Sequence, residues 1–141
     1  MIEVINHQRS RKFNAKQWRE FGERALRAID ASKPGAAIVL VSDAAIRKLN
    51  RQFRGKDQVT DVLSFPHEAE PFEKENQSQL GEVVISVQRA AAQAKLNGLT
   101  FSNEVEQLIL HGLLHLCGYD HETDDGEMNR LELKLRKKLG I

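Results

Sequence analysis

The sequence predicts an α+β fold: a single domain over residues 1–141, with a mixed sheet of about four strands and about five helices. A chain of 141 residues suits one hydrophobic core. Hydrophobic residues at 40% and charged residues at 29% are ordinary proportions for a globular protein. Short β-branched runs also alternate with segments whose apolar residues recur every three or four positions, which is the pattern of strands between helices.

The first half of the chain predicts strands and helices in alternation. Residues 2–7 begin with apolar, β-branched side chains and predict a first strand. Asn14 is placed to cap a helix, and the apolar residues that follow repeat at helical spacing. Residues 36–41 form a short apolar run typical of a buried strand. Ser42 or Asp43 then caps a short second helix.

The second half predicts two strands followed by three helices. The strands are residues 62–65, stopped by Pro66, and residues 80–87. An acidic stretch between them reads as a solvated loop. Its acidic residues are Glu68, Glu70, Glu73 and Glu75. The helices are expected at residues 88–97, from Ser102 or Asn103 to about 117, and from about Thr123 to Leu139. This pattern does not reveal the order of the strands in the sheet.

The net charge, the cysteine count and the hydropathy of the chain argue against several classes of protein. The net charge is +1, so the molecule as a whole is not a strongly basic nucleic-acid binder, and attraction to a polyanion requires a local cluster. One cysteine, Cys117, excludes an internal disulfide. No apolar stretch approaches the roughly 18 residues of a membrane span, and the N-terminus does not resemble a secretory signal. We therefore expect a cytoplasmic protein without a membrane partner.

Three histidines near the C-terminal end predict a metal site. His111 and His115 are four residues apart in an apolar helix, so their side chains are neighbours that can reach one ion. If the helix continued, His121 would lie roughly 9 Å further along its axis than His115. Gly118 removes this difficulty because glycine readily adopts the left-handed conformation that ends a helix. The spacing is also the histidine–glycine frame of the metzincin signature.

Three nitrogen ligands favour one zinc ion, although other divalent transition metals also bind imidazoles. A fourth position left for water is the pattern of a catalytic zinc site, where the water can become a nucleophile at neutral pH. Two alternatives remain: histidines without a metal, and a structural metal with Cys117 as fourth ligand. Because Cys117 points about 200° away from His115 on an ideal helix, it is better interpreted as a small core residue.

The residue after the first histidine argues against peptidase activity. Zinc peptidases of this pattern carry a glutamate there as general base, whereas this chain has Gly112. Asp120 or Glu122 are possible substitutes. Asp120 is equally a candidate for orienting a histidine or for forming a turn, and Glu122 for capping a helix or facing solvent.

A basic cluster points instead to phosphate chemistry. Its members are Arg47, Lys48, Arg51, Arg54 and Lys56. Such a cluster can bind phosphates, and arginine can do so with two hydrogen bonds; the alternative is an ordinary charged helix face. Combined with a metal site that lacks the peptidase glutamate, the cluster favours phosphodiester hydrolysis.

Two segments resemble the YbeY family of metal-dependent endoribonucleases, also called rRNA maturation factors. They are HGLLHLCGYDH at 111–121 and NRQFRGKDQVTDVLSFP at 50–66. LGEVVIS at 80–86 resembles the family's next strand, with Glu82 where aspartate is commoner. The resemblance implies an α+β fold with the metal on the helix at 103–117. It also implies cleavage of single-stranded RNA, processing of ribosomal RNA 3′ ends, action on defective ribosomes, and association with the small ribosomal subunit and its proteins.

The resemblance also implies roles for individual residues. Arg54 matches the family arginine associated with activity, so we expect it to bind or stabilise the scissile phosphate, and Lys56 is a second candidate for RNA binding. A general base is not implied. Two other functions stay open: a ribosome-assembly binding module whose metal is mainly structural, and a peptidase with an unusual base.

Overall fold

The computed structural model describes residues 1–67 and 79–141. Its four strands are β1 (Ile2–Asn6), β2 (Gly35–Val41), β3 (Val62–Pro66) and β4 (Gln79–Ser86). Its five helices are α1 (Ala15–Ile29), α2 (Asp43–Arg54), α3 (Val87–Asn97), α4 (Phe101–Leu116) and α5 (Glu127–Leu139). The predicted α+β class and element order are confirmed. The predicted acidic loop lies at 68–78, outside the described residues.

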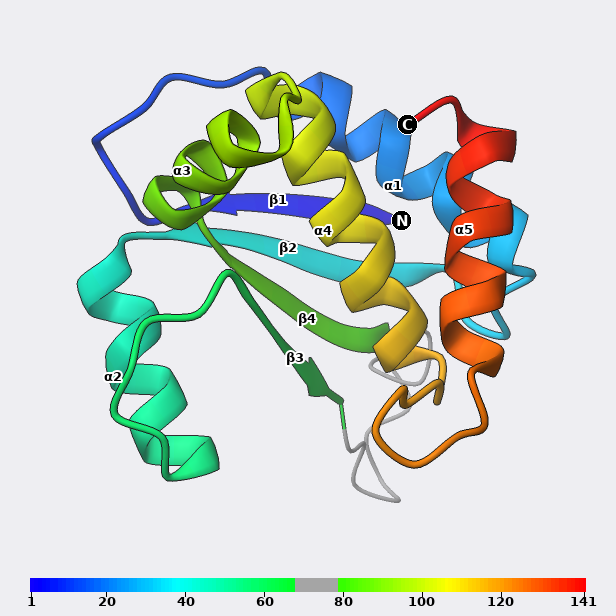
Figure 1. Cartoon of the computed structure of the whole chain (residues 1–141). Helices are drawn as coiled ribbons and strands as arrows, with labels where there is room; N and C mark the ends of the chain where they lie inside the picture. The colour runs from blue at the N-terminus through cyan, green and yellow to red at the C-terminus, as the bar shows by residue number, and fades with distance from the viewer. Residues whose placement is uncertain (68–78) are drawn as a thin grey trace.

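The sheet is mixed, with the strand order β1-β2-β4-β3. β2 pairs in parallel with β1 and with β4, whereas β3 runs antiparallel to β4 and forms one edge. The parallel connection from β1 to β2 passes through α1, as a parallel crossover requires. In Figure 1, β3 ends and β4 begins near the lower end of α4.

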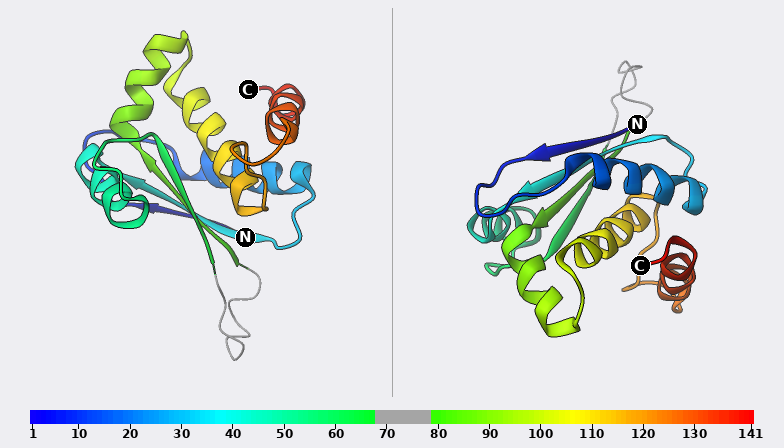
Figure 2. Two further views of the ribbon diagram at one scale, coloured as in Figure 1. Left: turned by 60° about the horizontal axis from the view of Figure 1, so that its bottom comes forward. Right: turned by 90° about the horizontal axis from the view of Figure 1, so that it is seen from above.

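Helices cover both faces of the sheet. All seven residues of β2 are buried, which explains why its sequence is continuously apolar rather than alternating. Ile38 and Leu40 face the larger core, which α1, α3, α4 and α5 complete. Val39 and Val41 face the smaller core beneath α2. In both views of Figure 2, α2 lies apart from α4 and α5, while its start contacts the start of α3.

Two helix starts differ from the sequence-based prediction. α4 begins at Phe101 rather than at Ser102 or Asn103, because the Thr100 hydroxyl accepts a hydrogen bond from the Asn103 backbone N–H at 3.1 Å. α5 begins at Glu127 rather than near Thr123. The Asp124 carboxylate accepts from the backbone N–H groups of Gly126 and Met128, at 2.8 and 2.9 Å, and so holds a turn ahead of the helix.

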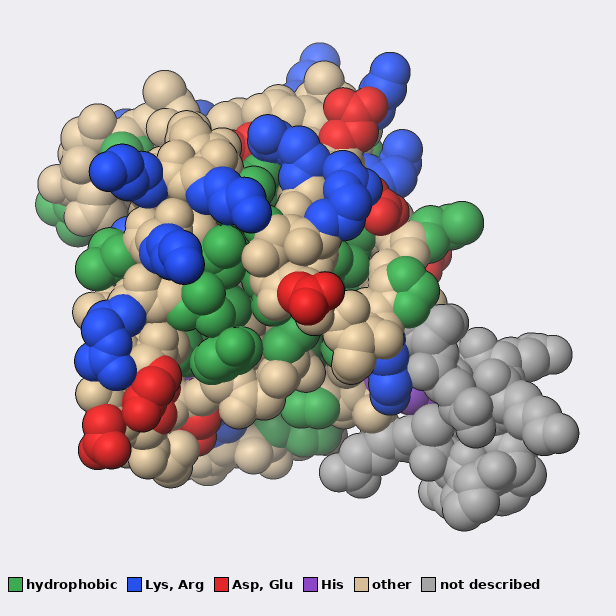
Figure 3. All heavy atoms as spheres, turned by 90° about the vertical axis from the view of Figure 1, so that its right-hand side faces the viewer, with side chains coloured by type: hydrophobic (Ala, Val, Ile, Leu, Met, Phe, Trp, Pro, Cys, Tyr) green, Lys and Arg blue, Asp and Glu red, His purple; other side chains and the backbone are tan. Residues whose placement is uncertain are grey.

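The surface carries mixed charge. On the face shown in Figure 3, lysine and arginine side chains are interspersed with acidic and exposed apolar ones. This distribution agrees with a net charge of +1. None of the described helices is long and apolar enough to cross a membrane.

Candidate metal centre and adjoining groove

Three histidine side chains converge where α4 ends. His111 and His115 lie half-buried on the last two turns of α4, and exposed His121 follows in the loop to α5. Their ring centroids are 4.8 Å apart for His111 and His115, 5.5 Å for His111 and His121, and 5.3 Å for His115 and His121. One nitrogen of each ring lies within 4.8 Å of the other two.

Gly118 produces this convergence in the way the sequence predicts. Its φ angle is 98°, a region that glycine reaches without a steric penalty from Cβ. Its N–H donates to the His115 carbonyl at 3.0 Å, and the Tyr119 N–H donates to the Leu114 carbonyl at 3.1 Å. These bonds close the end of α4 and turn the chain back, so that His121 returns to the helix rather than continuing along its axis.

The three rings fit a divalent metal ion. Two nitrogens bound to one tetrahedral zinc at roughly 2.0–2.1 Å lie about 3.4 Å apart, so small ring rotations are sufficient to bring the set into contact with an ion. Burial lowers the pKa of His115, and the charges of His111 and His121 lower it further. A lowered pKa favours the neutral imidazole, which is the form that binds metal. The cluster could therefore hold an ion.

Glu132 fixes the orientation of one of these rings. Its side chain comes from α5, is 7% exposed, and accepts a hydrogen bond at 2.7 Å from Nδ1 of His111. Its other oxygen accepts from Arg136 at 2.6 Å. Burial alone would raise the pKa of Glu132. The hydrogen bonds from His111 and Arg136 and the positive charges of these residues have a larger effect together, so the pKa of Glu132 is lowered. Since Nδ1 of His111 is engaged, Nε2 is the nitrogen left for a metal.

Gly112 lies where α4 packs directly on β4. A Cβ atom at this position would lie 2.9 Å from Cγ2 of buried Val83 and closer still to Cγ1. The Ser64 hydroxyl of β3 also donates to the Gly112 carbonyl at 3.2 Å. The position that carries the general base in zinc peptidases therefore faces the sheet and has no room for a side chain.

Cys117 and Asp120 have structural partners. Cys117 caps the end of α4, packs partly buried against the larger core, and has a thiol pKa raised by burial. Within the described residues, the candidate metal-binding group consists of the three histidines without this cysteine. The Asp120 carboxylate accepts from the Glu122 backbone N–H at 3.0 Å, so it forms a turn. Of the two roles considered for Asp120, orienting a histidine or forming a turn, this hydrogen bond supports the turn.

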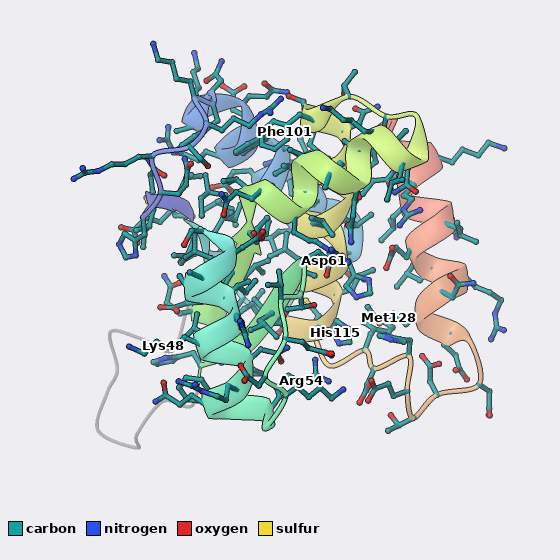
Figure 4. All side chains as sticks on the ribbon, turned by 60° about the vertical axis from the view of Figure 1, so that its left-hand side comes forward. Lys48, Arg54, Asp61, Phe101, His115 and Met128 are labelled. Carbon is teal, nitrogen blue, oxygen red and sulfur yellow. The ribbon has the colours of Figure 1, made fainter. Side chains whose placement is uncertain are left out.

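A groove of about 780 Å³ runs beside the histidines. β3 and the segment before it form one wall, and the loop after α4 forms another. Arg54 and Lys56 are the members of the basic cluster found among the described residues that line it. Figure 4 shows Arg54 at the end of α2, below His115 at the end of α4.

The remaining basic residues are placed differently. Arg47 donates to both oxygens of the Asp57 carboxylate, at 2.9 and 3.4 Å, and this bond holds the pKa of Asp57 below its usual value. Lys48 lies on the side of α2 turned away from the histidines (Figure 4). Arg54, in contrast, has a loose contact of 3.9 Å with Glu122, and both side chains are about half exposed. Its guanidinium can therefore turn toward a ligand in the groove at little cost.

Comparison with known proteins agrees with this architecture. A model of the endoribonuclease YbeY family matches residues 3–140. The chain belongs to the YbeY family. An endoribonuclease YbeY from Nautilia profundicola is 49% identical over 104 residues, which cover 74% of this chain and 71% of that protein. An endoribonuclease YbeY from Geobacter metallireducens is 35% identical over 141 residues, which cover 99% of this chain and 94% of that protein.

A solved structure supports the fold of this YbeY family member. The solution structure of a protein from Thermotoga maritima has a TM-score of 0.65 and 30% identity, and the match covers 99% of this chain and 89% of that one. The family consists of nuclease hydrolases, which agrees with a histidine cluster beside a groove that contains cations.

Sequence reasoning missed two residues at this site. Glu132 follows inward-facing Met128 by four residues, so it lies on the apolar side of α5. An acidic residue on the apolar side of a helix is the signal that could have revealed its role. Phe53 lines the groove although it is 60% exposed. Its position beside Arg54 in the basic segment gave a weaker signal, because a single aromatic in a charged helix is common.

Proposed function

We propose that this protein is a zinc-dependent endoribonuclease that cleaves single-stranded RNA. His111, His115 and His121 hold one metal ion, and Arg54 with Lys56 binds the RNA phosphates. The observation that carries this proposal is the juxtaposition of three converging histidine nitrogens with a groove containing these two cations, in a chain of an endoribonuclease family.

The biological role follows from the family. We infer that the substrate is ribosomal RNA, with processing of the small-subunit RNA 3′ end and removal of defective ribosomes as the tasks. The partners are then the small ribosomal subunit and its proteins, and the location is the cytoplasm. The net charge is only +1, and the groove holds Arg54 and Lys56 together with the acids Asp61, Asp120 and Glu122, which suits local contacts with phosphates at a defined place rather than a uniformly basic surface that coats RNA.

Each residue has a distinct task in the reaction. Zinc, when bound, supplies a Lewis acid and lowers the pKa of water. Arg54 leaves its loose contact with Glu122 and offsets the charge that develops on the scissile phosphate. Lys56 holds a phosphate of the same strand as a point charge. Glu132 keeps His111 in the tautomer and orientation that direct Nε2 toward the ion.

Peptide hydrolysis is the weaker alternative on this geometry. The only position that matches the peptidase base in the signature is Gly112, and it faces Val83 in the core. Arg54 and Lys56 can also bind a phosphate directly, although the groove contains the acids Asp61, Asp120 and Glu122 as well, and a peptide bond offers them no charge to pair with.

The test combines metal analysis with RNA cleavage. The wild type should contain about one equivalent of zinc and cleave a structured RNA in its single-stranded loops. His115→Ala should lose metal and cleavage, and Arg54→Ala should keep the metal but lose most cleavage. Arg47→Ala is the matched control, because Arg47 is paired with Asp57 outside the groove, and it should cleave normally.

Several results would overturn the proposal. Cleavage that survives both His115→Ala and Arg54→Ala would indicate a contaminating nuclease. Digestion of casein would support the peptidase. Metal-dependent folding with RNA binding but without cleavage would support a ribosome-assembly module. Analysis of product ends separates the two routes of attack, since a 2′,3′-cyclic phosphate identifies the RNA's own 2′-hydroxyl as the nucleophile.

A further inference from the structure

Phe53 is an exposed aromatic side chain inside the groove. It is the residue before Arg54 at the end of α2, and its exposed fraction is 60%. The other large hydrophobic residues that are exposed in the described structure are Met1, Leu96 and Leu133, none of which is aromatic or lines this groove. Phe53 is thus an exposed ring that shares a cavity with the histidines.

The ring is held in place by a neighbour and is not part of a core. Its centroid lies 5.2 Å from that of Phe65 on β3, with an angle of 68° between the ring planes. This edge-to-face contact restrains the ring but leaves most of its surface in solvent. The smaller core beneath α2 is completed by other residues, including Ile46, Leu63 and Val84, which are 4% exposed or less. Packing of that core does not account for an exposed phenyl group.

The surroundings of the ring match the chemistry of a single nucleic-acid strand. Such a strand alternates an anionic phosphate with a flat base, and proteins bind it by combining cations with aromatic rings on which bases stack. Arg54 and Lys56 supply the cations in this groove, which also contains the acids Asp61, Asp120 and Glu122, and Phe53 supplies a ring next to Arg54 in the sequence. In a duplex the base faces are already covered by neighbouring base pairs, so the ring is useful only for unpaired bases.

We propose that Phe53 is a stacking site for an unpaired nucleobase next to the phosphate that Arg54 binds. This inference rests on the proposed function and deepens it, because it assigns the preference for single strands to a particular side chain. Stacking on a phenyl ring is tolerant of base identity, so the site selects unpaired structure rather than sequence.

The experiment uses the metal-loaded protein and a 2′-O-methyl decaadenylate, which binds but resists cleavage by its own hydroxyl groups. Phe53→Leu keeps an apolar side chain over Phe65 but removes the aromatic face. It should weaken binding of this oligonucleotide on the order of tenfold. It should leave binding of inorganic polyphosphate, an anionic chain without bases, unchanged. Phe53→Tyr should bind the oligonucleotide like the wild type.

A fluorescent variant reports the contact directly. The native Trp18 is 1% exposed and gives a background that ligands in the groove do not reach. Phe53→Trp should be quenched when the decaadenylate binds, because a base stacks on the indole. Leu133→Trp is the matched control, since Leu133 on α5 is 53% exposed and lies outside the groove, and it should not be quenched.

The outcomes separate this inference from the function on which it rests. If Arg54→Ala abolishes cleavage while Phe53→Leu binds the decaadenylate as tightly as wild type, the stacking site is wrong and the nuclease stands. Equal losses for the oligonucleotide and polyphosphate would also overturn it, because they would indicate a general disturbance of the groove. If the wild type neither binds nor cleaves RNA, both proposals fall.

Discussion

Glu132→Gln tests whether the α5 carboxylate prepares His111 for metal binding. Glu132 is 7% exposed and accepts short hydrogen bonds from His111 and Arg136, at 2.7 and 2.6 Å. Glutamine has almost the same volume, so the change removes the charge without opening a cavity. A charge-assisted hydrogen bond is worth about 1.5–3 kcal/mol. Converted at about 1.4 kcal/mol per tenfold, this range corresponds to roughly 10- to 150-fold in an equilibrium constant.

Mutation of a residue that hydrogen-bonds to a metal-bound histidine typically lowers metal affinity by a similar factor, about 10- to 100-fold. We therefore expect Glu132→Gln to bind zinc 10- to 100-fold more weakly, measured by competition with a chromogenic chelator at one fixed pH. Glu104→Gln is the control: Glu104 is also buried, at 4% exposed, but it lies on α4 and bonds with Asn97 rather than with a histidine. Zinc affinity of Glu132→Gln within twofold of wild type, in a protein of normal fold, would refute the reasoning.

Three further predictions concern packing, pH and metal removal. Gly112→Ala should lower the free energy of unfolding by about 1–3 kcal/mol in urea titrations, because the added Cβ overlaps buried Val83, and Val83→Ala should restore part of the loss. Burial, with a smaller effect of the Asp61 charge, raises the pKa of Glu104 above 4.5, so the folded state keeps a proton that the unfolded state releases. Wild-type stability relative to Glu104→Gln should therefore decline as pH rises from 4.5 through that raised value, and the difference should stop changing below pH 4.5; a constant difference across the whole titration would contradict this. Chelation should lower Tm by several degrees, since a ligand present at a thousand times its Kd stabilises the fold by about 4 kcal/mol, whereas an unchanged Tm would mean that the histidines hold no ion.

The element order was predictable because it depends on local periodicity. β2 is a run of apolar residues with both faces buried, and α1 begins after Asn14, whose side chain accepts from the Gln17 N–H as a cap should. Helix boundaries were harder to predict where several neighbouring residues could act as the N-cap. Thr100, Ser102 and Asn103 are all residues that favour a cap, and the structure uses Thr100.

Strand order could not be predicted because it is set by packing between distant segments. β3 and β4 are consecutive and antiparallel, but β4 also pairs with β2, a strand that is distant from it in the sequence. The histidine geometry was predictable for the opposite reason: helical spacing and one glycine are local. Glu132 was missed because its partner His111 is 21 residues away in the sequence.

The three candidate ligands differ in how firmly the fold holds them. His111 and His115 project from an α4 that is anchored in the larger core, whereas His121 lies on an exposed loop that starts at Gly118 and reaches α5 after Gly126, both with positive φ. An ion at this site would therefore be held by two imidazoles on a helix anchored in the core and by a third imidazole on an exposed loop. We therefore predict that exchange of a bound ion with solvent would follow local opening of this loop and would not require unfolding of the core.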